Sequence, residues 1–446
     1  MSLRFGTDGV RGVANSELTP ELALALGWAA AQVMPAERIV IGRDTRRSGP
    51  LIESALAAGC ASAGIDVERL GVVPTPAVAY VAQREGVPGA MISASHNPFP
   101  DNGIKLFGPG GRKLGDGVEE QIEEQIERVL AGGAADRPVA ERVGTLMDRP
   151  DEVGAYADHL VGVLEGRELA GLRVAIDCAN GAAWALGPHV FERLGADVVA
   201  VGNAPDGTNI NARCGATHPD ALAEVVAAGG FDLGLAFDGD GDRCIAVDHT
   251  GAIVDGDHII AICALDLRAR GALIADTVVV TVMTNLGFRQ AMQRAGVTVV
   301  ETAVGDRYVL EVIERDGYAI GGEQSGHVIF PAHATTGDGI LTGLVIADVV
   351  ARSGRPLADL SAEAMTRLPQ MLVNLRVAGN AGDAVRQSAQ AVRDAEAALG
   401  ERGRVLVRAS GTEPLVRVMV EAPTDDEAHR IADQIAAAIR AADAGR

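Results

Sequence analysis

Short Val- and Ile-rich runs alternate with longer Ala- and Leu-rich segments along most of the chain. Apolar runs of about five residues fit buried strands, and longer segments with apolar positions every three or four residues fit helices. The predicted strands are 38–42, 90–93, 173–177, 232–237 and 277–282, and the predicted helices include 20–33, 50–63 and 118–130. The glutamates of the last helix are interpreted as its solvated face. Alternating strands and helices predict an α/β architecture.

The end of the chain follows a different pattern. Residues 404–408 and 415–421 are predicted to be paired strands, and Thr424 with Glu427 forms a capping box for a helix that ends at Ala441. A small α+β module is therefore expected at this end. Polar and Gly-rich stretches place boundaries near residues 150, 250 and 368, which predicts segments 1–150, 151–250, 251–368 and 369–446.

Composition narrows the class of protein. A chain of 446 residues with 48% hydrophobic content predicts several domains. A formal net charge of −21 argues against nucleic-acid binding, because the phosphate backbone would be repelled. The N-terminus lacks an apolar signal core, and no uncharged run is long enough to cross a bilayer, so a cytoplasmic protein without a membrane partner is expected. Five scattered cysteines fit buried side chains better than a disulfide framework: Cys60, Cys178, Cys214, Cys244 and Cys263.

The clearest chemical signal is the run Asp238-Gly239-Asp240-Gly241-Asp242, which follows an apolar strand. Carboxylates at i, i+2 and i+4 can converge on one divalent cation when glycines let the backbone curl. A calcium loop of the helix-loop-helix type needs Gly at position six and Glu at position twelve, where this chain has Arg243 and His249. An acidic turn exposed to water is the other interpretation, but three alternating aspartates would be an unfavourable choice for a turn, because their charges repel. A divalent-metal site is the favoured reading.

A second candidate centre is the segment 91–98, Met-Ile-Ser-Ala-Ser-His-Asn-Pro, in which a strand runs into a polar loop. Ser95 beside His96 suggests acyl transfer, but neighbouring residues of a strand point to opposite sides and the Gly-x-Ser-x-Gly elbow is missing. We therefore expect no hydrolase triad. A serine that carries a phosphoryl group next to the metal is the alternative, although a lone serine is more often a turn residue.

Three further segments carry groups that bind phosphates or sugars. The first is 5–12, where glycines expose amides and Arg11 supplies a guanidinium. The second is 408–414 with Arg417, where hydroxyls, amides and two guanidiniums suit a phosphate. A polar hairpin without a ligand is the alternative interpretation of this segment. The third is the glycine-rich loop 321–327, whose carboxylate, amide, hydroxyl and imidazole suit sugar hydroxyls.

Taken in order, these segments resemble the α-D-phosphohexomutase superfamily over nearly the whole chain. The resemblance rests on the Ser95–Pro98 loop, the Asp238–Asp242 loop with Arg243, the Gly322–His327 loop and the Arg408–Pro414 loop. Gln324 resembles the branch that acts on glucosamine phosphates, because the phosphomannomutase/phosphoglucomutase branch usually has Met there.

The resemblance implies three related α/β domains with mixed sheets and a smaller C-terminal α+β domain, arranged around a central cleft. It implies interconversion of glucosamine 6-phosphate and glucosamine 1-phosphate, a step toward UDP-N-acetylglucosamine and the bacterial cell wall. One Mg²⁺ per chain, a hexosamine or hexose 1,6-bisphosphate activator, a phosphorylated amino sugar as ligand and a homodimer are also implied.

The resemblance also implies roles for individual residues. Ser95 would carry the phosphoryl group, and its phosphate would share the metal with Asp238, Asp240 and Asp242. Lys105 and His327 are both candidates for the general base, with Arg11 and His96 as electrostatic partners. The residues implied in substrate binding are Arg243, Glu323, Ser325, Arg408, Ser410, Gly411, Thr412 and Arg417.

Other functions stay open from the sequence. A phosphomannomutase/phosphoglucomutase would use the same chemistry on another sugar, a non-catalytic sensor would keep the fold, and a phosphatase would release the phosphate to water. A mobile fourth domain is expected, because closure over the substrate would exclude water from the phosphoserine.

Overall fold

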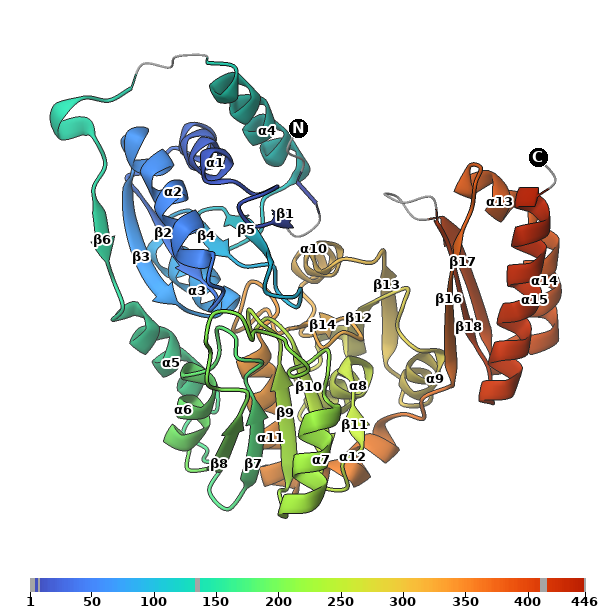
Figure 1. Cartoon of the computed structure of the whole chain (residues 1–446). Helices are drawn as coiled ribbons and strands as arrows, with labels where there is room; N and C mark the ends of the chain where they lie inside the picture. The colour runs from blue at the N-terminus through green and yellow to red at the C-terminus, as the bar shows by residue number, and fades with distance from the viewer. Residues whose placement is uncertain (1–4, 7–8, 133–136, 410–414, 445–446) are drawn as a thin grey trace. The chain divides into compact units, whose positions relative to one another are not determined.

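The computed structural model describes residues 5–6, 9–132, 137–409 and 415–444. The chain divides into two compact units (Figure 1). Unit 1 comprises Met1–Met283 and Val297–Ala362, and unit 2 comprises Thr284–Gly296 and Glu363–Arg446. Each unit is described by itself.

The first part of unit 1 is a mixed six-stranded sheet with the order β1-β5-β4-β2-β3-β6. Its strands are β1 (Val10–Val13), β2 (Arg38–Arg43), β3 (Asp66–Val72), β4 (Gly89–Ile92), β5 (Asp101–Phe107) and β6 (Leu146–Asp148). Its helices are α1 (Pro20–Val33), α2 (Gly49–Ser62), α3 (Thr75–Glu85) and α4 (Asp116–Leu130).

The two faces of this sheet are covered by different helices. Ile39 and Ile41 of β2 share a core with α1, α2 and α4. Alternate residues of a strand point to opposite faces, and Val40 accordingly lies with Val78 of α3 around Gly89. The sheet is therefore buried on both sides, as the continuous apolar runs in the sequence predicted.

The second sheet has five strands in the order β11-β10-β9-β7-β8. Its strands are β7 (Arg173–Asp177), β8 (Asp197–Val201), β9 (Leu233–Phe237), β10 (Cys244–Asp248) and β11 (Ile253–Val254). The associated helices are α5 (Glu152–Gly162), α6 (Leu186–Arg193) and α7 (Asp220–Gly229).

The third sheet has four strands in the order β13-β12-β14-β15. Its strands are β12 (Thr277–Thr281), β13 (Thr298–Thr302), β14 (Gly321–Gly322) and β15 (Val328–Ile329). The helices around it in the chain are α8 (Gly256–Ala269), α10 (Asp306–Asp316), α11 (Gly339–Ser353) and α12 (Leu357–Ala364).

The three sheets of unit 1 share one feature of topology. In each sheet one inner strand, β2, β7 or β12, has parallel neighbours on both sides, and an antiparallel hairpin leads towards one edge: β4–β5, β9–β10 and β14–β15. The loops of these hairpins contain Ser95, the three aspartates and Glu323–His327 respectively. The same structural position therefore carries three of the candidate loops of unit 1, one in each sheet.

Unit 2 has an antiparallel sheet of order β16-β18-β17. It comprises α9 (Leu286–Arg294), β16 (Gln370–Arg376), α13 (Ala381–Gln387), α14 (Ala389–Leu399), β17 (Arg404–Ala409), β18 (Leu415–Glu421) and α15 (Asp425–Ala444). Val416, Val418 and Val420 of β18 pack with helix residues in the core of this unit. The intervening residues, Arg417 among them, lie on the other face.

The predicted elements correspond closely to the structure. The strand predicted at 173–177 has the same bounds as β7, and the helix predicted at 20–33 has the same bounds as α1. The Glu427 amide donates to Thr424 Oγ1 at 3.3 Å, as an N-terminal cap requires. The last helix runs to Ala444, three residues beyond the predicted end.

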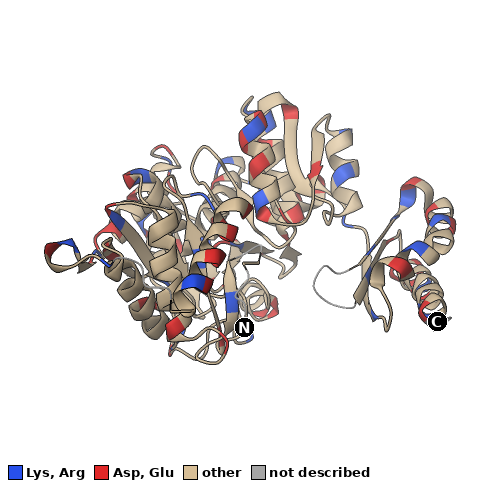
Figure 2. Ribbon diagram, turned by 90° about the horizontal axis from the view of Figure 1, so that it is seen from above, with Lys and Arg blue, Asp and Glu red and all other residues tan. Residues whose placement is uncertain are grey.

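Charged residues lie mainly on helices and loops, and the strands are mostly uncharged (Figure 2). Four of the five cysteines are buried and all five are free thiols. Within the described ranges, none of the helices combines the length and the apolar character that a bilayer span needs.

Candidate active site

The three aspartates lie in the tight hairpin loop between β9 and β10, in which Phe237 pairs with Cys244. Asp238, Asp240 and Asp242 are buried, and one carboxylate oxygen of each lies within 4.8 Å of the others. Gly241 has φ +72°, a conformation that glycine adopts without strain. The alternation in the sequence thus becomes a cluster of three converging carboxylates.

Ser95 lies against this cluster. Its Oγ donates to Asp238 Oδ2 at 2.6 Å, across 143 residues of sequence. The two loops touch so closely that a methyl group on Gly239 would lie 2.5 Å from the Ser95 carbonyl oxygen. Ser95 is fully buried, so the structure brings the predicted nucleophile and the predicted metal loop into direct contact.

One expectation about this loop is wrong. Ser95 and His96 do not point to opposite sides, because Ser95 Oγ lies 3.3 Å from His96 Nδ1. The alternation rule holds for extended strands, whereas Ser95 lies in a turn after β4 and has a left-handed φ of +51°. Burial lowers the pKa of His96 to about 4, with help from Arg243 and Arg11, so the imidazole is neutral beside the serine at neutral pH.

Lys105 and Thr75 complete the surroundings of the carboxylates. Lys105 is on β5, opposite Met91 of β4, and its Nζ lies 2.8 Å from Asp240 Oδ2 and 3.3 Å from Asp242 Oδ2. Thr75, at the start of α3, donates its hydroxyl to the same Asp240 oxygen at 2.6 Å. The cluster, which follows β9 of the second sheet, is therefore held by contacts from β5 and α3 of the first sheet's domain.

The donor set fits a hard divalent cation. The buried Oδ1 atoms of Asp240 and Asp242 accept no hydrogen bond within the described structure. Burial and the charges of Asp242 and Asp240 raise the pKa of Asp238 well above its usual range. Burial also disfavours charge on Asp242, but Lys105 and His327 hold its pKa well below the usual range. Unused carboxylate oxygens in mutual repulsion are the arrangement that a bound Mg²⁺ relieves.

The loop between β14 and β15 reaches the same cluster through His327. The Nδ1 atom of His327 lies 3.7 Å from Asp242 Oδ2, and its Nε2 atom lies 3.4 Å from Asp306 Oδ2. Burial lowers the pKa of His327, but the two carboxylates outweigh burial and raise it overall. The Gly337 amide donates to Nε2 at 3.0 Å, which places the proton of the neutral ring on Nδ1.

The loop is also held by a backbone contact and by a contact of the Glu323 side chain. The Gly326 carbonyl accepts from the amide of Cys244 at 3.0 Å, which joins the loop to the end of the aspartate hairpin. The side-chain Oε1 of Glu323 accepts from the Gly305 amide at 3.1 Å. The buried Oγ of Ser325 has no hydrogen-bond partner among the described atoms, and Arg243 Nε lies 3.8 Å from Asp242 Oδ1.

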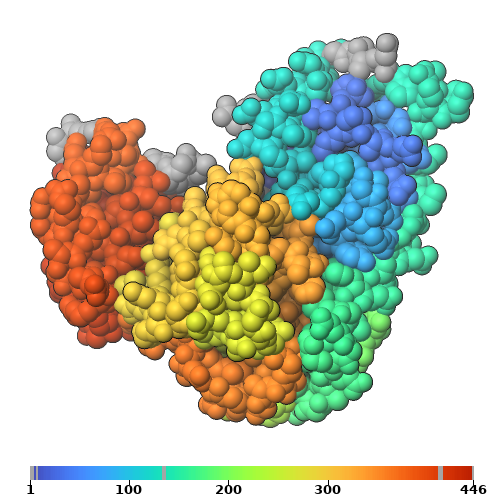
Figure 3. All heavy atoms as spheres, turned by 180° about the vertical axis from the view of Figure 1, so that it is seen from behind, coloured from blue at the N-terminus to red at the C-terminus, as the bar shows by residue number. Residues whose placement is uncertain are grey.

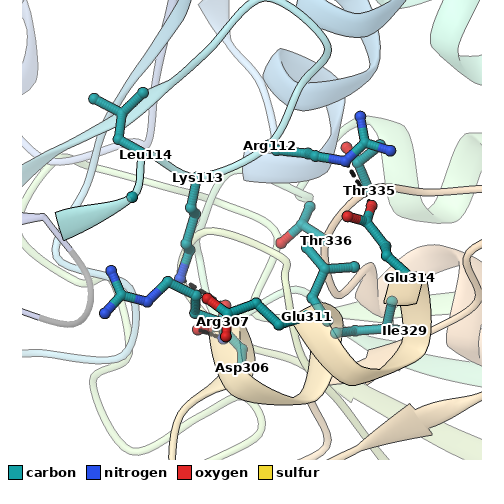
Figure 4. Close-up of a pocket in the computed structure, with 12 residues that line it drawn as sticks. Arg112, Lys113, Leu114, Asp306, Arg307, Glu311, Glu314, Ile329, Thr335 and Thr336 are labelled. Carbon is teal, nitrogen blue, oxygen red and sulfur yellow. Dashed lines mark hydrogen bonds and ion pairs between the residues drawn. The ribbon is translucent and has the colours of Figure 1, made fainter. Parts of the chain in front are cut away.

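A charged pocket of about 120 Å³ lies beside Asp306 (Figure 4). Lys113 Nζ is 2.6 Å from Asp306 Oδ2, and Arg112 Nε is 2.5 Å from Glu314 Oε1. These pairs join the segment after β5 to α10, and the two segments adjoin on the molecular surface (Figure 3). Asp306 therefore links His327 to a lysine of the first sheet's domain.

Unit 2 contains the remaining basic residues of the prediction. Arg408 of β17 pairs directly with Arg417 of β18, and Asn374 of β16 is the next residue in that row. Burial and the charge of Arg417 lower the pKa of Arg408. Two guanidiniums and an amide in one row suit a phosphate dianion, since like charges opposite each other are otherwise unfavourable. The predicted residues Ser410, Gly411 and Thr412 lie outside the described part of the chain.

Sequence reasoning missed several residues that the structure brings to this centre. Thr75, Asp306, Arg46 and Asn211 each contact a candidate loop from a distant part of the chain. None of these four residues stands in a sequence pattern that by itself predicts a role in the site. Arg11 was predicted; it lies on β1 and pairs with Gly103 of β5, the strand that also carries Lys105.

Comparison with known proteins agrees with this architecture. Models of the phosphoglucomutase/phosphomannomutase domains match in order: alpha/beta/alpha domain I at residues 2–131, domain II at 154–251, domain III at 255–368 and the C-terminal domain at 372–438. The chain thus has four domains of this kind.

Relatives match over the full length. A phosphoglucosamine mutase of Frankia casuarinae is 55% identical over 98% of both chains, and one of Streptomyces coelicolor is 53% identical over 99% of this chain and all of that one. The crystal structure of a phosphoglucomutase/phosphomannomutase family protein from Burkholderia thailandensis has a TM-score of 0.80 at 26% identity, and covers 98% of this chain and 97% of that one. The chain belongs to the phosphoglucomutase/phosphomannomutase family, in its phosphoglucosamine mutase branch.

Proposed function

We propose that the protein is a phosphoglucosamine mutase, which interconverts glucosamine 6-phosphate and glucosamine 1-phosphate. The observation that carries the proposal is the 2.6 Å contact between Ser95 Oγ and Asp238 inside a cluster of three buried carboxylates. The full-length similarity to phosphoglucosamine mutases supports the choice of substrate.

In the proposed reaction Ser95 carries a phosphoryl group. The bond between phosphorus and Ser95 Oγ breaks as a free sugar hydroxyl forms its own bond to phosphorus, which gives a 1,6-bisphosphate. After the sugar is turned over in the site, its other phosphate returns to Ser95 and the product leaves. No phosphate from solution is consumed, and an added 1,6-bisphosphate would restore any Ser95 that has lost its group.

The attacking hydroxyl loses its proton to a base. Lys105 and His327 are the two candidates, and their nitrogen atoms lie 3.3 Å and 3.7 Å from the same oxygen of Asp242. Each base faces the carboxylate cluster from a different hairpin. That arrangement is suited to a reaction whose two halves use different sugar hydroxyls, with one base for each half.

Asp238, Asp240 and Asp242 would hold Mg²⁺ together with a phosphate oxygen on Ser95, and the ion would withdraw charge from the transferring group. Glu323, Ser325 and Arg243 would contact the sugar, while Arg408 and Arg417 with residues 410–412 would bind the phosphate that is not reacting. The product would serve synthesis of UDP-N-acetylglucosamine in the cytoplasm.

The test is to compare mutase rates on one preparation. The full chain is assayed with Mg²⁺ and a trace of glucose 1,6-bisphosphate on glucosamine 6-phosphate, mannose 6-phosphate and glucose 6-phosphate. The highest kcat/KM is expected for glucosamine 6-phosphate. Preference for mannose or glucose would contradict the substrate assignment, and no turnover of any of them by Ser95-phosphorylated protein would contradict the enzyme.

A further inference from the structure

Arg46, in the loop between β2 and α2, is a fully buried arginine that the reaction described above does not use. Its guanidinium has five N–H groups, and five hydrogen bonds are formed. Nε donates to Asp44 at 2.8 Å. The two Nη atoms donate to four backbone carbonyls of the segment that carries Ser95: Pro98 (2.5 Å), Asp101 (3.0 Å), Ser95 (3.0 Å) and Asn97 (2.8 Å).

The guanidinium is itself fixed by Asp44. The carboxylate of Asp44 accepts from both the backbone amide and Nε of Arg46, at 2.9 and 2.8 Å. Asp44 also accepts from Ser93 Oγ at 2.5 Å, and that hydroxyl accepts from the Ser95 amide at 2.9 Å. Arg46 and Asp44 therefore bind the carbonyl and the amide of Ser95, the carbonyl directly and the amide through Ser93.

A residue of the second sheet's domain binds the same loop. Asn211 Nδ2 donates to the carbonyls of Ser95 at 2.8 Å and Asn97 at 3.1 Å. Arg46 and Asn211 thus share two acceptors, although 165 positions separate them in the sequence. These shared hydrogen bonds act on the backbone of the loop, since neither side chain bonds to the Ser95 hydroxyl.

The backbone conformation of Ser95 explains why these hydrogen bonds are needed. Ser95 has φ +51°, a left-handed conformation that costs a non-glycine residue of order 1 kcal/mol. A free loop would relax out of it and swing Oγ away from Asp238. Bonds to both the amide and the carbonyl of Ser95 are the contacts that oppose this rotation.

We propose that Arg46 is a positioning residue that fixes Ser95 for phosphoryl transfer to the sugar rather than to water; this inference rests on the proposed mutase function. The substrate is held by its own phosphate and hydroxyls, so it cannot follow a displaced phosphoserine, whereas water can reach the phosphorus from many directions. In the water reaction the P–Oγ bond breaks and water oxygen bonds to phosphorus. One water proton restores the Ser95 hydroxyl and the other stays on phosphate or passes to solvent.

The test is Arg46→Lys in the full chain, because lysine keeps the charge beside Asp44 but has only three donors. Ser95 is phosphorylated with glucose 1,6-bisphosphate, and the phosphorylated fraction is measured by intact mass. Isomerisation of glucosamine 6-phosphate and release of inorganic phosphate are then followed per phosphorylated chain. We expect kcat to fall about 10²-fold with KM nearly unchanged, and phosphate release per isomerisation to rise about tenfold.

Two further variants secure the interpretation. Asn211→Ala should raise phosphate release per isomerisation by a smaller factor. It tests the role of the hydrogen bonds to the Ser95 loop if Arg46→Lys does not fold. Arg47→Lys is the matched control, since Arg47 is the adjacent residue and is exposed. An unchanged ratio in both Arg46→Lys and Asn211→Ala, with activity reduced only in proportion to folded protein, would overturn the inference. Absence of isomerisation in the unsubstituted protein would instead overturn the proposed function.

Discussion

The aspartate hairpin of unit 1 and the arginine row of unit 2 both suit phosphate chemistry, but they are built differently. The carboxylates at 238, 240 and 242 are buried and receive contacts from Ser95, Thr75, Lys105 and His327. Arg408 and Arg417 are half-buried, on the sheet face opposite the core of unit 2. The first region is fixed on folding, whereas the second keeps its guanidiniums accessible to a ligand.

The difference separates positioning from affinity. Reacting atoms need fixed geometry, because a displacement of about 1 Å costs about 10²-fold in rate. A phosphate that only anchors the substrate needs charge and hydrogen-bond donors. Substitutions in the hairpin should therefore lower kcat, and substitutions in the row should act mainly on KM.

The largest effect is expected from Ser95→Ala. Without Oγ no phosphoenzyme can form, so mutase activity should fall by about 10⁴-fold or more while the fold is kept. Mass spectrometry after incubation with glucose 1,6-bisphosphate should show no added phosphate on the variant. A sensor that only binds phosphosugars would lose little of its binding on this substitution. Mutase activity retained by Ser95→Ala would contradict the catalytic role of Ser95.

Asp240→Asn should have the next largest effect. The change removes one carboxylate of the metal cluster, and a loss of several kcal/mol of charge stabilisation corresponds to about 10³-fold in kcat. Chelation of the unsubstituted protein with EDTA should abolish activity, and Mg²⁺ should restore it. Asp232→Asn, at an exposed position just before β9, is the control and should retain both activity and metal dependence.

Arg417→Ala should act on binding. Loss of hydrogen bonds to a phosphate dianion is worth about 1.5–3 kcal/mol, or about 10–100-fold in kcat/KM. Most of this loss in kcat/KM should come from a higher KM for glucosamine 6-phosphate. Arg376→Ala, which changes an exposed arginine two residues after Asn374 on β16, should change KM little. A pure loss of kcat in Arg417→Ala would remove the distinction between the two regions.

The smallest effect concerns Asp338, the N-cap of α11, whose neighbour Gly339 donates to the Gly241 carbonyl in the aspartate hairpin. Burial raises the pKa of Asp338 to about 6, although the Leu341 amide and Tyr156 favour the charged form. The folded state therefore holds this proton more tightly than the unfolded state. Its contribution to stability is complete below about pH 4 and is lost as the pH rises through 6.

Asp338→Asn imitates the neutral form and keeps a side-chain oxygen for the Leu341 amide. The melting temperature of the variant relative to the unsubstituted protein should rise by several °C between pH 4 and pH 7, for a difference of up to about 3 kcal/mol. Asp359→Asn, an exposed change in the first turn of α12, should show no such trend. A pH-independent difference would mean that Asp338 is charged without cost.

Local patterns predicted most of the fold and the core of the candidate site. The run 173–177 is β7 because its apolar residues fill the interior of a sheet buried on both faces. The aspartate alternation forms a carboxylate cluster because glycines allow the hairpin to curl. In both cases the physical cause lies within a few neighbouring residues.

The contacts that local patterns could not predict are long-range. Thr75 reaches Asp240 across 165 residues, and Asn211 reaches Ser95 across 116. A threonine at a helix start and an asparagine in a loop have ordinary local uses, so nothing nearby marks these two. The expectation for His96 failed for a related reason, since one left-handed residue redirected the side chain.

Helix α9 separates β12 from β13 in the sequence, yet it belongs to the compact unit that contains the C-terminal sheet. Glu421 of β18 accepts from the Leu286 amide at 3.0 Å and from Asn285 at 3.3 Å, which ties the start of α9 to that sheet. The polypeptide consequently passes between the two units at three places. A protease that cuts only near residue 363 would leave the C-terminal fragment bound to α9, and release of unit 2 as a separate body would need cleavage at all three connections.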